Sequence, residues 1–206
     1  MPSNSSPRAL APTLWPAEAN SAARQVLLVL AGTLLIAIAA KIKVPFYPVP
    51  MTLQTLAILL IAATYGMRLG TLTVLAYLLE GLLGLPVFAN TPPGIAGPAY
   101  FLGTTGGFLV GFVILAFVVG WATDRGWDRS IVKLFAAMVV GEVVMMALGF
   151  GWLAWFASLS SGATGLGSAK AWAGGITPFI LGDVLKIVLA ALAVPAAWSL
   201  VDNSDA

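Results

Sequence analysis

Long apolar runs, separated by short polar or Pro/Gly-rich stretches, form the hydrophobic pattern of this 206-residue chain. A run of about 20 apolar residues is long enough to cross a bilayer as an α-helix. The pattern predicts an all-α integral membrane protein with six transmembrane helices, near residues 24–40, 51–67, 69–83, 99–121, 131–157 and 175–201. A six-helix membrane domain, residues 24–201, would then lie between an N-terminal tail, residues 1–23, and a C-terminal tail, residues 202–206.

The N-terminal tail is rich in Ser, Pro and Ala, a composition typical of a disordered or loosely attached segment. An alternative interpretation of the first apolar run is a signal peptide with Ala37-Ile-Ala39 as its cleavage signal. The leader before Arg24 is long for a signal peptide, and the chain that follows is equally apolar. The pattern therefore favours a retained helix.

Prolines and glycines shape two of the connections between the spans. Residues 41–50 contain three prolines, which lack a backbone N–H and disfavour helix at the residue before them. We expect an extended, stiff connection here, followed by a helix that begins near Met51 with Thr52 as its N-cap. Residues 84–98 are too rich in Pro and Gly for a helix and yet apolar, so we expect them to pack against the helix ends.

Charged residues are sparse, and this limits the chemistry available to the chain. Only 9% of the residues are charged and 60% are hydrophobic, whereas soluble domains have about 25% charged residues. The chain has no Cys and no His, which removes thiolate chemistry, the commonest general base and the commonest transition-metal ligand. The composition favours transport or binding over catalysis and predicts no metal site. The small net charge of +2, without a basic run, predicts no nucleic-acid partner.

The distribution of lysines and arginines predicts the orientation in the membrane. Six spans would place both termini on the same side of the membrane. That side has six basic residues, which are Arg8, Arg24, Arg68, Arg125, Arg129 and Lys133. The other side has three, which are Lys41, Lys43 and Lys170. Because cytoplasmic loops hold the excess of Lys and Arg, we predict cytoplasmic termini in a multi-pass protein of the bacterial cytoplasmic membrane. The connections 41–50, 84–98 and 158–170 would then all face outside.

Two opposite charges interrupt the last apolar run. Asp183 and Lys186 lie three residues apart, so in a helix they share one face. Each would cost about 2.5–3.5 kcal/mol at the centre of a span facing lipid, so we expect the pair to face protein or a polar cavity. It is either part of a binding site or a structural ion pair. Glu80 and Glu142 are lone acids within spans, and either a functional role or interhelical hydrogen bonding fits them.

Five motifs, in order along the chain, are similar to those of a known family. They are Pro45–Pro50 (PFYPVP) with Thr52 and Gln54; Gly66 and Gly70 around Arg68; Tyr77 and Gly81 with Gly84–Ala89 (GLPVFA); Gly103–Phe108 (GTTGGF) leading to Gly111; and Pro178–Lys186 (PFILGDVLK). On these motifs the chain resembles, over roughly residues 26–201, the BioY family, the biotin-specific substrate-binding (S) components of energy-coupling factor (ECF) transporters. One departure precedes the fourth span, where the family often has Gly-Pro-Thr-Gly-Gly and this chain has Gly103-Thr-Thr-Gly-Gly.

The resemblance implies a membrane subunit that captures biotin with high affinity outside the cell and has no enzymatic activity or cofactor of its own. By position it assigns ligand contacts to Asn90, Asp183 and Lys186. The chemistry fits, because an ionised Asp183 would accept from the ureido N–H groups while Lys186 or Asn90 donates to the ureido carbonyl. Further candidates by location are Thr52, Gln54, Phe46, Tyr47, Phe88, Tyr100 and Trp172, and Lys41 or Lys43 would attract the valerate carboxylate.

Uphill uptake would need partners, because the chain has no Gly-x-x-x-x-Gly-Lys-Ser/Thr motif for ATP. The resemblance implies a transmembrane coupling subunit and a pair of cytoplasmic ATPases. A small-residue face of the first span, with Thr33 and Ala37, is the predicted coupling-subunit contact. Two alternatives remain: an S component for another small vitamin, or a non-transporting membrane scaffold subunit that binds no small ligand.

Overall fold

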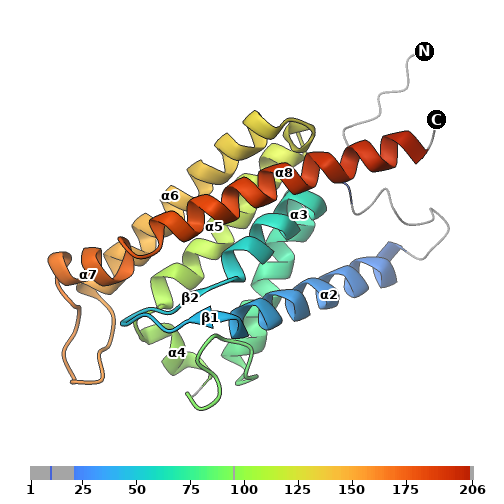
Figure 1. Ribbon diagram of the computed structural model, residues 1–206. Helices are drawn as coiled ribbons and strands as arrows, with labels where there is room; N and C mark the ends of the chain where they lie inside the picture. Colours follow the sequence, from blue (N-terminus) through green and yellow to red (C-terminus); the bar gives the residue numbers. More distant parts are fainter. Residues whose placement is uncertain (1–9, 11–20, 95, 205–206) are drawn as a thin grey trace.

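The computed structural model describes residue 10, residues 21–94 and residues 96–204, and over these residues the chain is mostly helical (Figure 1). The elements in chain order are α2 (Ser21–Lys41), β1 (Lys43–Val44), β2 (Met51–Thr52), α3 (Gln54–Leu82), α4 (Pro98–Leu102), α5 (Gly106–Thr123), η1 (Trp127–Arg129), α6 (Ile131–Trp155), α7 (Ser168–Gly175) and α8 (Ile180–Ser204). Within the described residues, five helices are long and apolar enough to cross a membrane: α2, α3, α5, α6 and α8. The prediction of a mostly helical, multi-span membrane protein is confirmed, whereas its number of six transmembrane helices is not. Most of the predicted N-terminal tail lies outside the described residues.

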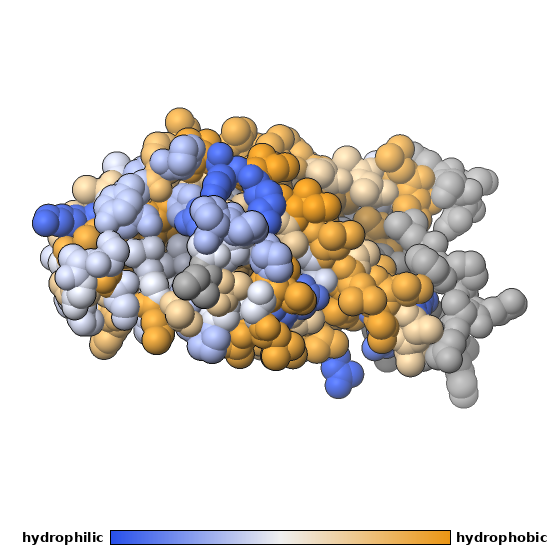
Figure 2. All heavy atoms as spheres, turned by 90° about the horizontal axis from the view of Figure 1, so that it is seen from below, coloured by the Kyte–Doolittle hydropathy of each residue, from blue (hydrophilic) through white to orange (hydrophobic). Residues whose placement is uncertain are grey.

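Large apolar side chains cover the outer surfaces of several helices. Leu34 of α2, Val143 of α6 and Leu181 of α8 are 61%, 61% and 82% exposed. Such surfaces are rare on soluble monomers, whereas lipid chains cover them readily. Figure 2 shows the contrast on one face, where hydrophilic residues gather over one part and hydrophobic side chains cover much of the rest.

The helix α5 forms the centre of the bundle. It is the most buried of the five candidate spans, with 67% of its 18 apolar-stretch residues buried inside the protein. Glycines allow its close contact with α6: a Cβ at Gly107 would lie 2.3 Å from the Cβ of Trp152, and one at Gly111 would lie 2.7 Å from the Cγ of Met145. The close approach predicted from the Gly107/Gly111 pair is therefore present.

The helix α3 reverses direction at Gly66. The φ and ψ angles of Gly66, 80° and −179°, fall in a region that essentially only glycine adopts. Gln54 Nε2 donates to the hydroxyl of Tyr77 at 2.8 Å, although a straight helix would separate two such residues by about 35 Å. Residues 54–65 and 67–82 therefore pack side by side as a helical hairpin.

The connection predicted to be extended and stiff is a short β-hairpin. β1 pairs antiparallel with β2, with Lys43 opposite Thr52. The predicted N-cap at Thr52 is wrong, because pairing with β1 holds this residue extended and Leu53 takes the cap position. The hydroxyl of Thr52 still accepts a hydrogen bond from the backbone N–H of Gln54, at 3.2 Å.

The predictions of continuous fourth and sixth spans are wrong at their first turns. The fourth is divided into α4 and α5, and residues 176–179 at the start of the sixth form turns, so that α8 begins five residues later than predicted. Gly103 is extended between α4 and α5, and its carbonyl accepts from Trp152 Nε1 at 2.8 Å. Pro178 disfavours helix at the residue before it, so α8 begins only at Ile180.

The connections gather at two ends of the molecule. At one end Asp124 accepts from the backbone N–H of Met67 at 3.3 Å, and Trp198 Nε1 donates to Asp128 at 2.6 Å. At the other end the β-hairpin lies against α7, where a Cβ on Gly174 would approach Pro48 to 2.6 Å. We call this second end, with the β-hairpin, residues 83–94, α4 and α7, the loop end.

Candidate functional site

The predicted charge pair is formed and buried. Lys186 Nζ lies 2.8 Å from Asp183 Oδ1, and the two residues are 6% and 4% exposed. Asp183 lies in the first turn of α8, where the partial positive charge of the helix N-terminus favours a carboxylate. Lys186 Nζ also donates to Thr55 Oγ1 of α3 at 3.1 Å. The pair thus faces protein and joins α8 to α3.

A small cavity lies beside the pair, bounded by α3, α4, α5, α6 and α8. Its volume is about 50 Å³, whereas ligand pockets usually measure about 300–1,000 Å³. The predicted contact residues that line it are Thr52, Gln54, Phe88, Tyr100, Asp183 and Lys186. A bicyclic ligand would fit only if part of this wall moves.

A chain of polar side chains forms one wall of the cavity. The Thr52 hydroxyl donates to Gln54 Oε1 at 3.2 Å, and Gln54 Nε2 donates to the hydroxyl of Tyr77 at 2.8 Å. The Tyr77 hydroxyl in turn donates to the carbonyl of Val87 at 3.1 Å. Both halves of the α3 hairpin are therefore tied to the connection that follows them.

Aromatic rings form a second wall, centred on Phe88. This ring stacks on Tyr100 with centroids 4.5 Å apart, and meets Tyr77 edge-on at 5.5 Å. Gly81 makes room for it, because a Cβ there would lie 2.0 Å from Phe88 Cζ. Flat apolar walls of this kind suit a fused-ring ligand.

Four predicted contact residues lie at the loop end without lining this cavity. Asn90 is exposed, and its Oδ1 accepts from Lys43 Nζ at 2.7 Å. Tyr47 is exposed, while Phe46 meets the ring of Phe179 at 6.4 Å. Trp172 packs edge-on against Phe150 across the α6–α7 contact. Their roles as ligand contacts stay predictions.

Several lining residues were not predicted from the sequence. They are Thr55, Thr105, Phe108, Phe112, Met145, Met146 and Phe179. Thr105, Phe108 and Phe179 lie within the family motifs, but nothing in the motifs marks them as lining residues. The other apolar residues lie within apolar runs and resemble ordinary core. Glu142 does have a signal, a lone acid in a span, and the structure buries it against the Asp183–Lys186 pair.

Lys41 and Lys43 fasten residues 83–94 to the end of α2. Lys41 Nζ donates to the carbonyls of Pro86 and Phe88, each at 2.6 Å, and to that of Thr91. Lys43 Nζ donates to the carbonyl of Ala89 at 2.9 Å and to Asn90. The lysines predicted to attract the valerate carboxylate therefore hold the backbone that carries Phe88.

Replacing Lys41 by Met should loosen this connection. Met keeps an apolar side chain of similar length but removes the donors from three carbonyls; charge-assisted bonds contribute about 1.5–3 kcal/mol each. For biotin, the ligand that the resemblance implies, we expect faster dissociation and an affinity lower by about tenfold, measured by stopped-flow exchange of labelled biotin. The exposed Lys170, changed to Met, is the matched control; equal dissociation rates in the two variants would contradict the assignment.

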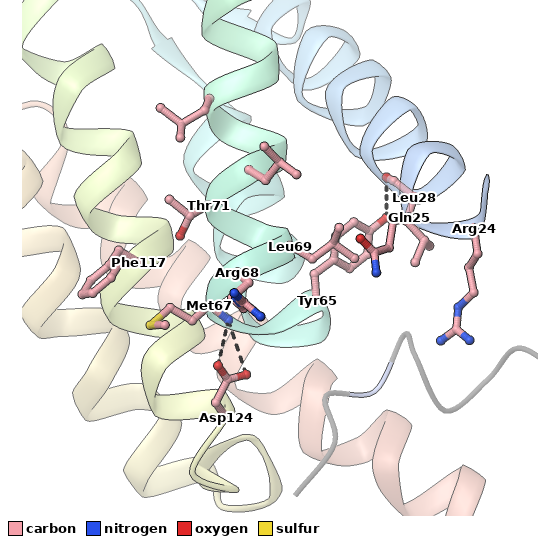
Figure 3. A pocket seen from close by; sticks show the side chains of 12 residues that line it. Arg24, Gln25, Leu28, Tyr65, Met67, Arg68, Leu69, Thr71, Phe117 and Asp124 are labelled. Atoms are coloured by element: carbon pink, nitrogen blue, oxygen red, sulfur yellow. Dashed lines mark hydrogen bonds between the residues drawn. The ribbon is translucent and has the colours of Figure 1, made fainter. Parts of the chain in front are cut away.

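A larger groove lies at the opposite end of the molecule, between α2 and residues 67–82 of α3 (Figure 3). Its volume is about 930 Å³, and Arg24, Arg68 and Asp124 are among its lining residues. The hydroxyl of Tyr65 donates to the carbonyl of Leu28 at 3.1 Å on its wall. The groove is remote from the Asp183–Lys186 pair, so its size does not make it the predicted ligand site.

The predicted coupling face on α2 is partly turned inward. Thr33 is buried, and its hydroxyl donates to the carbonyl of Leu30 at 3.1 Å. Ala37 is half-buried, while Ile38 beside it is exposed. A partner that approaches α2 would meet Ala37 and large aliphatic side chains before it met Thr33.

Comparison with known proteins decides the family. A sequence model described as the BioY family matches residues 11–203. The chain belongs to the BioY family. The family inferred from the five motifs is thereby confirmed.

Individual members of the BioY family are similar over most of their length. The probable biotin transporter BioY of Pyrococcus horikoshii is 37% identical over 182 residues, which cover 88% of this chain and 99% of that protein. The biotin transporter BioY of Thermotoga maritima is 38% identical over 160 residues, covering 78% and 87%. A crystal structure of the S-component for biotin from an ECF-type ABC transporter matches with a TM-score of 0.70 and 23% identity, covering 89% of this chain and 95% of that one. At this identity the likeness shows a shared fold.

Proposed function

We propose that this chain binds biotin and serves as the substrate-specific subunit of an ECF-type transporter for biotin uptake. The observation that carries the proposal is a buried Asp183–Lys186 pair beside an aromatic-walled cavity, in a chain of the BioY family. Its relatives named biotin transporters support the choice of ligand. The family and the fold point to transport rather than enzymatic activity.

The ureido ring of biotin matches the pair. It offers two N–H donors and one carbonyl acceptor, and Asp183 is an acceptor for the N–H groups. The Lys186 ammonium has three N–H groups and uses two of them on Asp183 and Thr55, which leaves one for the ureido carbonyl. Charge-assisted bonds are about twice as strong as neutral ones, so they can fix the ligand's orientation.

Biotin binding requires the loop end to move, since the cavity of about 50 Å³ is too small for the fused rings. The β-hairpin and residues 83–94 are the parts that we propose as a lid. Asn90, Phe46, Tyr47 and Trp172 lie around this lid, and we propose that they reach the ligand when it moves. We propose that Lys43 attracts the valerate carboxylate at the same end.

We further propose that the site opens to the outside of the bacterial cytoplasmic membrane, with both termini in the cytoplasm. The reversal at Gly66 supports six helical segments, because it divides α3 into two antiparallel halves. The excess of Lys and Arg at the end opposite the loop end supports this orientation.

Energy for uphill uptake comes, in this proposal, from a transmembrane coupling subunit and two cytoplasmic ATPases. The chain lacks the phosphate-binding motif that would let it use ATP directly. The α2 face around Ala37, with Thr33 behind it, is the proposed contact for the coupling subunit.

Equilibrium binding of radiolabelled biotin tests the proposal. Purified protein should bind biotin saturably, and excess unlabelled biotin, but not thiamine or riboflavin, should displace it. Sealed right-side-out vesicles should bind biotin without permeabilisation, and inverted vesicles should not. Displacement by another vitamin would favour an S component of different specificity. Absence of saturable binding of any vitamin would favour a scaffold subunit.

A further inference from the structure

Three ionisable side chains, not two, are buried together beside the cavity. Glu142 of α6 is 6% exposed and faces Asp183 and Lys186 of α8. Two carboxyl groups therefore share one ammonium group. If both carboxyls were ionised, the cluster would hold an uncompensated negative charge within a membrane span, which is strongly unfavourable.

The hydrogen bonds of the cluster are incomplete if both acids are carboxylates. Asp183 Oδ1 accepts from Lys186, but Asp183 Oδ2 and both oxygens of Glu142 then have no donor. Glu142 and Asp183 line the same groove, so a hydrogen bond between their carboxyl groups is the contact that would complete the cluster. Two carboxylates cannot make that bond, whereas a carboxylic acid and a carboxylate can.

The surroundings of Glu142 also disfavour its charged form. A groove of about 450 Å³ runs between α6 and α8, and Glu142 and Asp183 line its floor. The other lining residues are apolar, and Val143 and Val184 on it are exposed to the lipid side. Asp183 lines both this groove and the cavity. Asp183 thus lies between the proposed ligand site and this groove, and Glu142 lines the groove beside it.

We propose that Glu142 is a positioning residue of the binding site, kept as a neutral carboxylic acid whose O–H donates to Asp183 Oδ2. Glu142 then holds the carboxylate of Asp183 in place while Lys186 binds its other oxygen. Asp183 keeps its remaining lone pairs for the N–H groups of the ligand. This inference takes the identity of the ligand from the proposed function. The protonation state proposed for Glu142 does not depend on it.

The charge of Glu142 depends on few other groups. Besides Asp183 and Lys186, the ionisable residues on α6 and on the elements packed against it are Lys133 of α6, Lys170 of α7, Asp128 and Arg129 of η1, and Asp202 near the end of α8; α5 has none. Lys133, Lys170, Asp128 and Arg129 do not line the groove that contains Glu142. Deprotonation of Glu142 would remove the donor and add a charge facing Asp183, so affinity should fall as the pH rises.

Two variants and one control test the proposal. Glu142→Gln keeps an N–H donor for Asp183 and should bind biotin within about threefold of the unmodified protein. Glu142→Ala removes the donor and should weaken binding about tenfold or more. Binding by the unmodified protein should weaken at alkaline pH, whereas binding by Glu142→Gln should stay flat over the same range. Glu80→Gln, a change of the other lone acid within a span, should leave affinity and pH profile unchanged.

A second measurement does not need biotin. The infrared spectrum of the unmodified protein minus that of Glu142→Gln should contain the C=O band of a protonated carboxylic acid at neutral pH. Absence of this band, or the same alkaline loss of binding in both proteins, would overturn the inference. If no protein binds biotin, the proposed function fails, and the infrared band still decides the state of Glu142.

Discussion

Asp183→Asn should lower the affinity for biotin about 100-fold or more. The change removes the negative charge that accepts from the ureido N–H groups and turns a charge-assisted bond with Lys186 into a weaker one. Bonds to charged groups contribute about 1.5–3 kcal/mol each, and each 1.4 kcal/mol is about tenfold in affinity, so the loss of the charge-assisted bonds to the two ureido N–H groups gives this magnitude. Equilibrium binding of radiolabelled biotin to the purified variant measures it.

Lys186→Met should have an effect at least as large, because it leaves Asp183 buried without its cation. The competing explanation is a structural ion pair that only holds α8 against α3. Asp128→Asn is the matched control, since this buried acid bonds to Trp198 at the other end of the molecule and should change stability without changing affinity. Normal affinity in folded Asp183→Asn and Lys186→Met proteins would remove the pair from the site.

The features that were predicted correctly from the sequence depend on residues that are near one another in the chain. The apolar runs located the membrane helices, and the spacing of Asp183 and Lys186 placed both on one helix face. The Pro- and Gly-rich stretches marked the connections at the loop end. These patterns are local, so helix period and backbone preference suffice to interpret them.

What the sequence did not predict depends on contacts between distant segments. Nothing near Lys41 in the chain indicates that it binds the carbonyls of Pro86 and Phe88. The burial of Glu142 against Asp183 likewise follows from the packing of α6 on α8. The predicted N-cap at Thr52 was wrong because strand pairing overrode a local preference, and Leu53 takes the cap position. Long-range packing thus decides which polar residues form the site.

Gly66→Ala should destabilise the protein and weaken biotin binding together. The angles of Gly66, φ 80° and ψ −179°, belong to a region that a residue with a Cβ adopts at a cost of about 1–3 kcal/mol. The turn also packs tightly, since a Cβ on Gly120 of α5 would lie 2.7 Å from the carbonyl carbon of Gly66. Relief of the strain would rotate one half of the α3 hairpin against the other. Thermal unfolding followed by tryptophan fluorescence and radiolabelled biotin binding measure the two effects.

The link from Gly66 to the site runs along the hairpin. Its two halves meet near the cavity through the Gln54–Tyr77 hydrogen bond of 2.8 Å, and Tyr77 holds residue 87 of the proposed lid. A rotation at the turn would separate these side chains at the far end of the helices. Gly162→Ala is the control, because Gly162 has nearly the same φ, 81°, with open space around it. The Gly162→Ala protein should be less stable because of backbone strain, and its affinity for biotin should be unchanged. A Gly66→Ala protein that binds biotin as tightly as Gly162→Ala would show that the site tolerates a shift of the hairpin, and that the lid, rather than α3, sets its geometry.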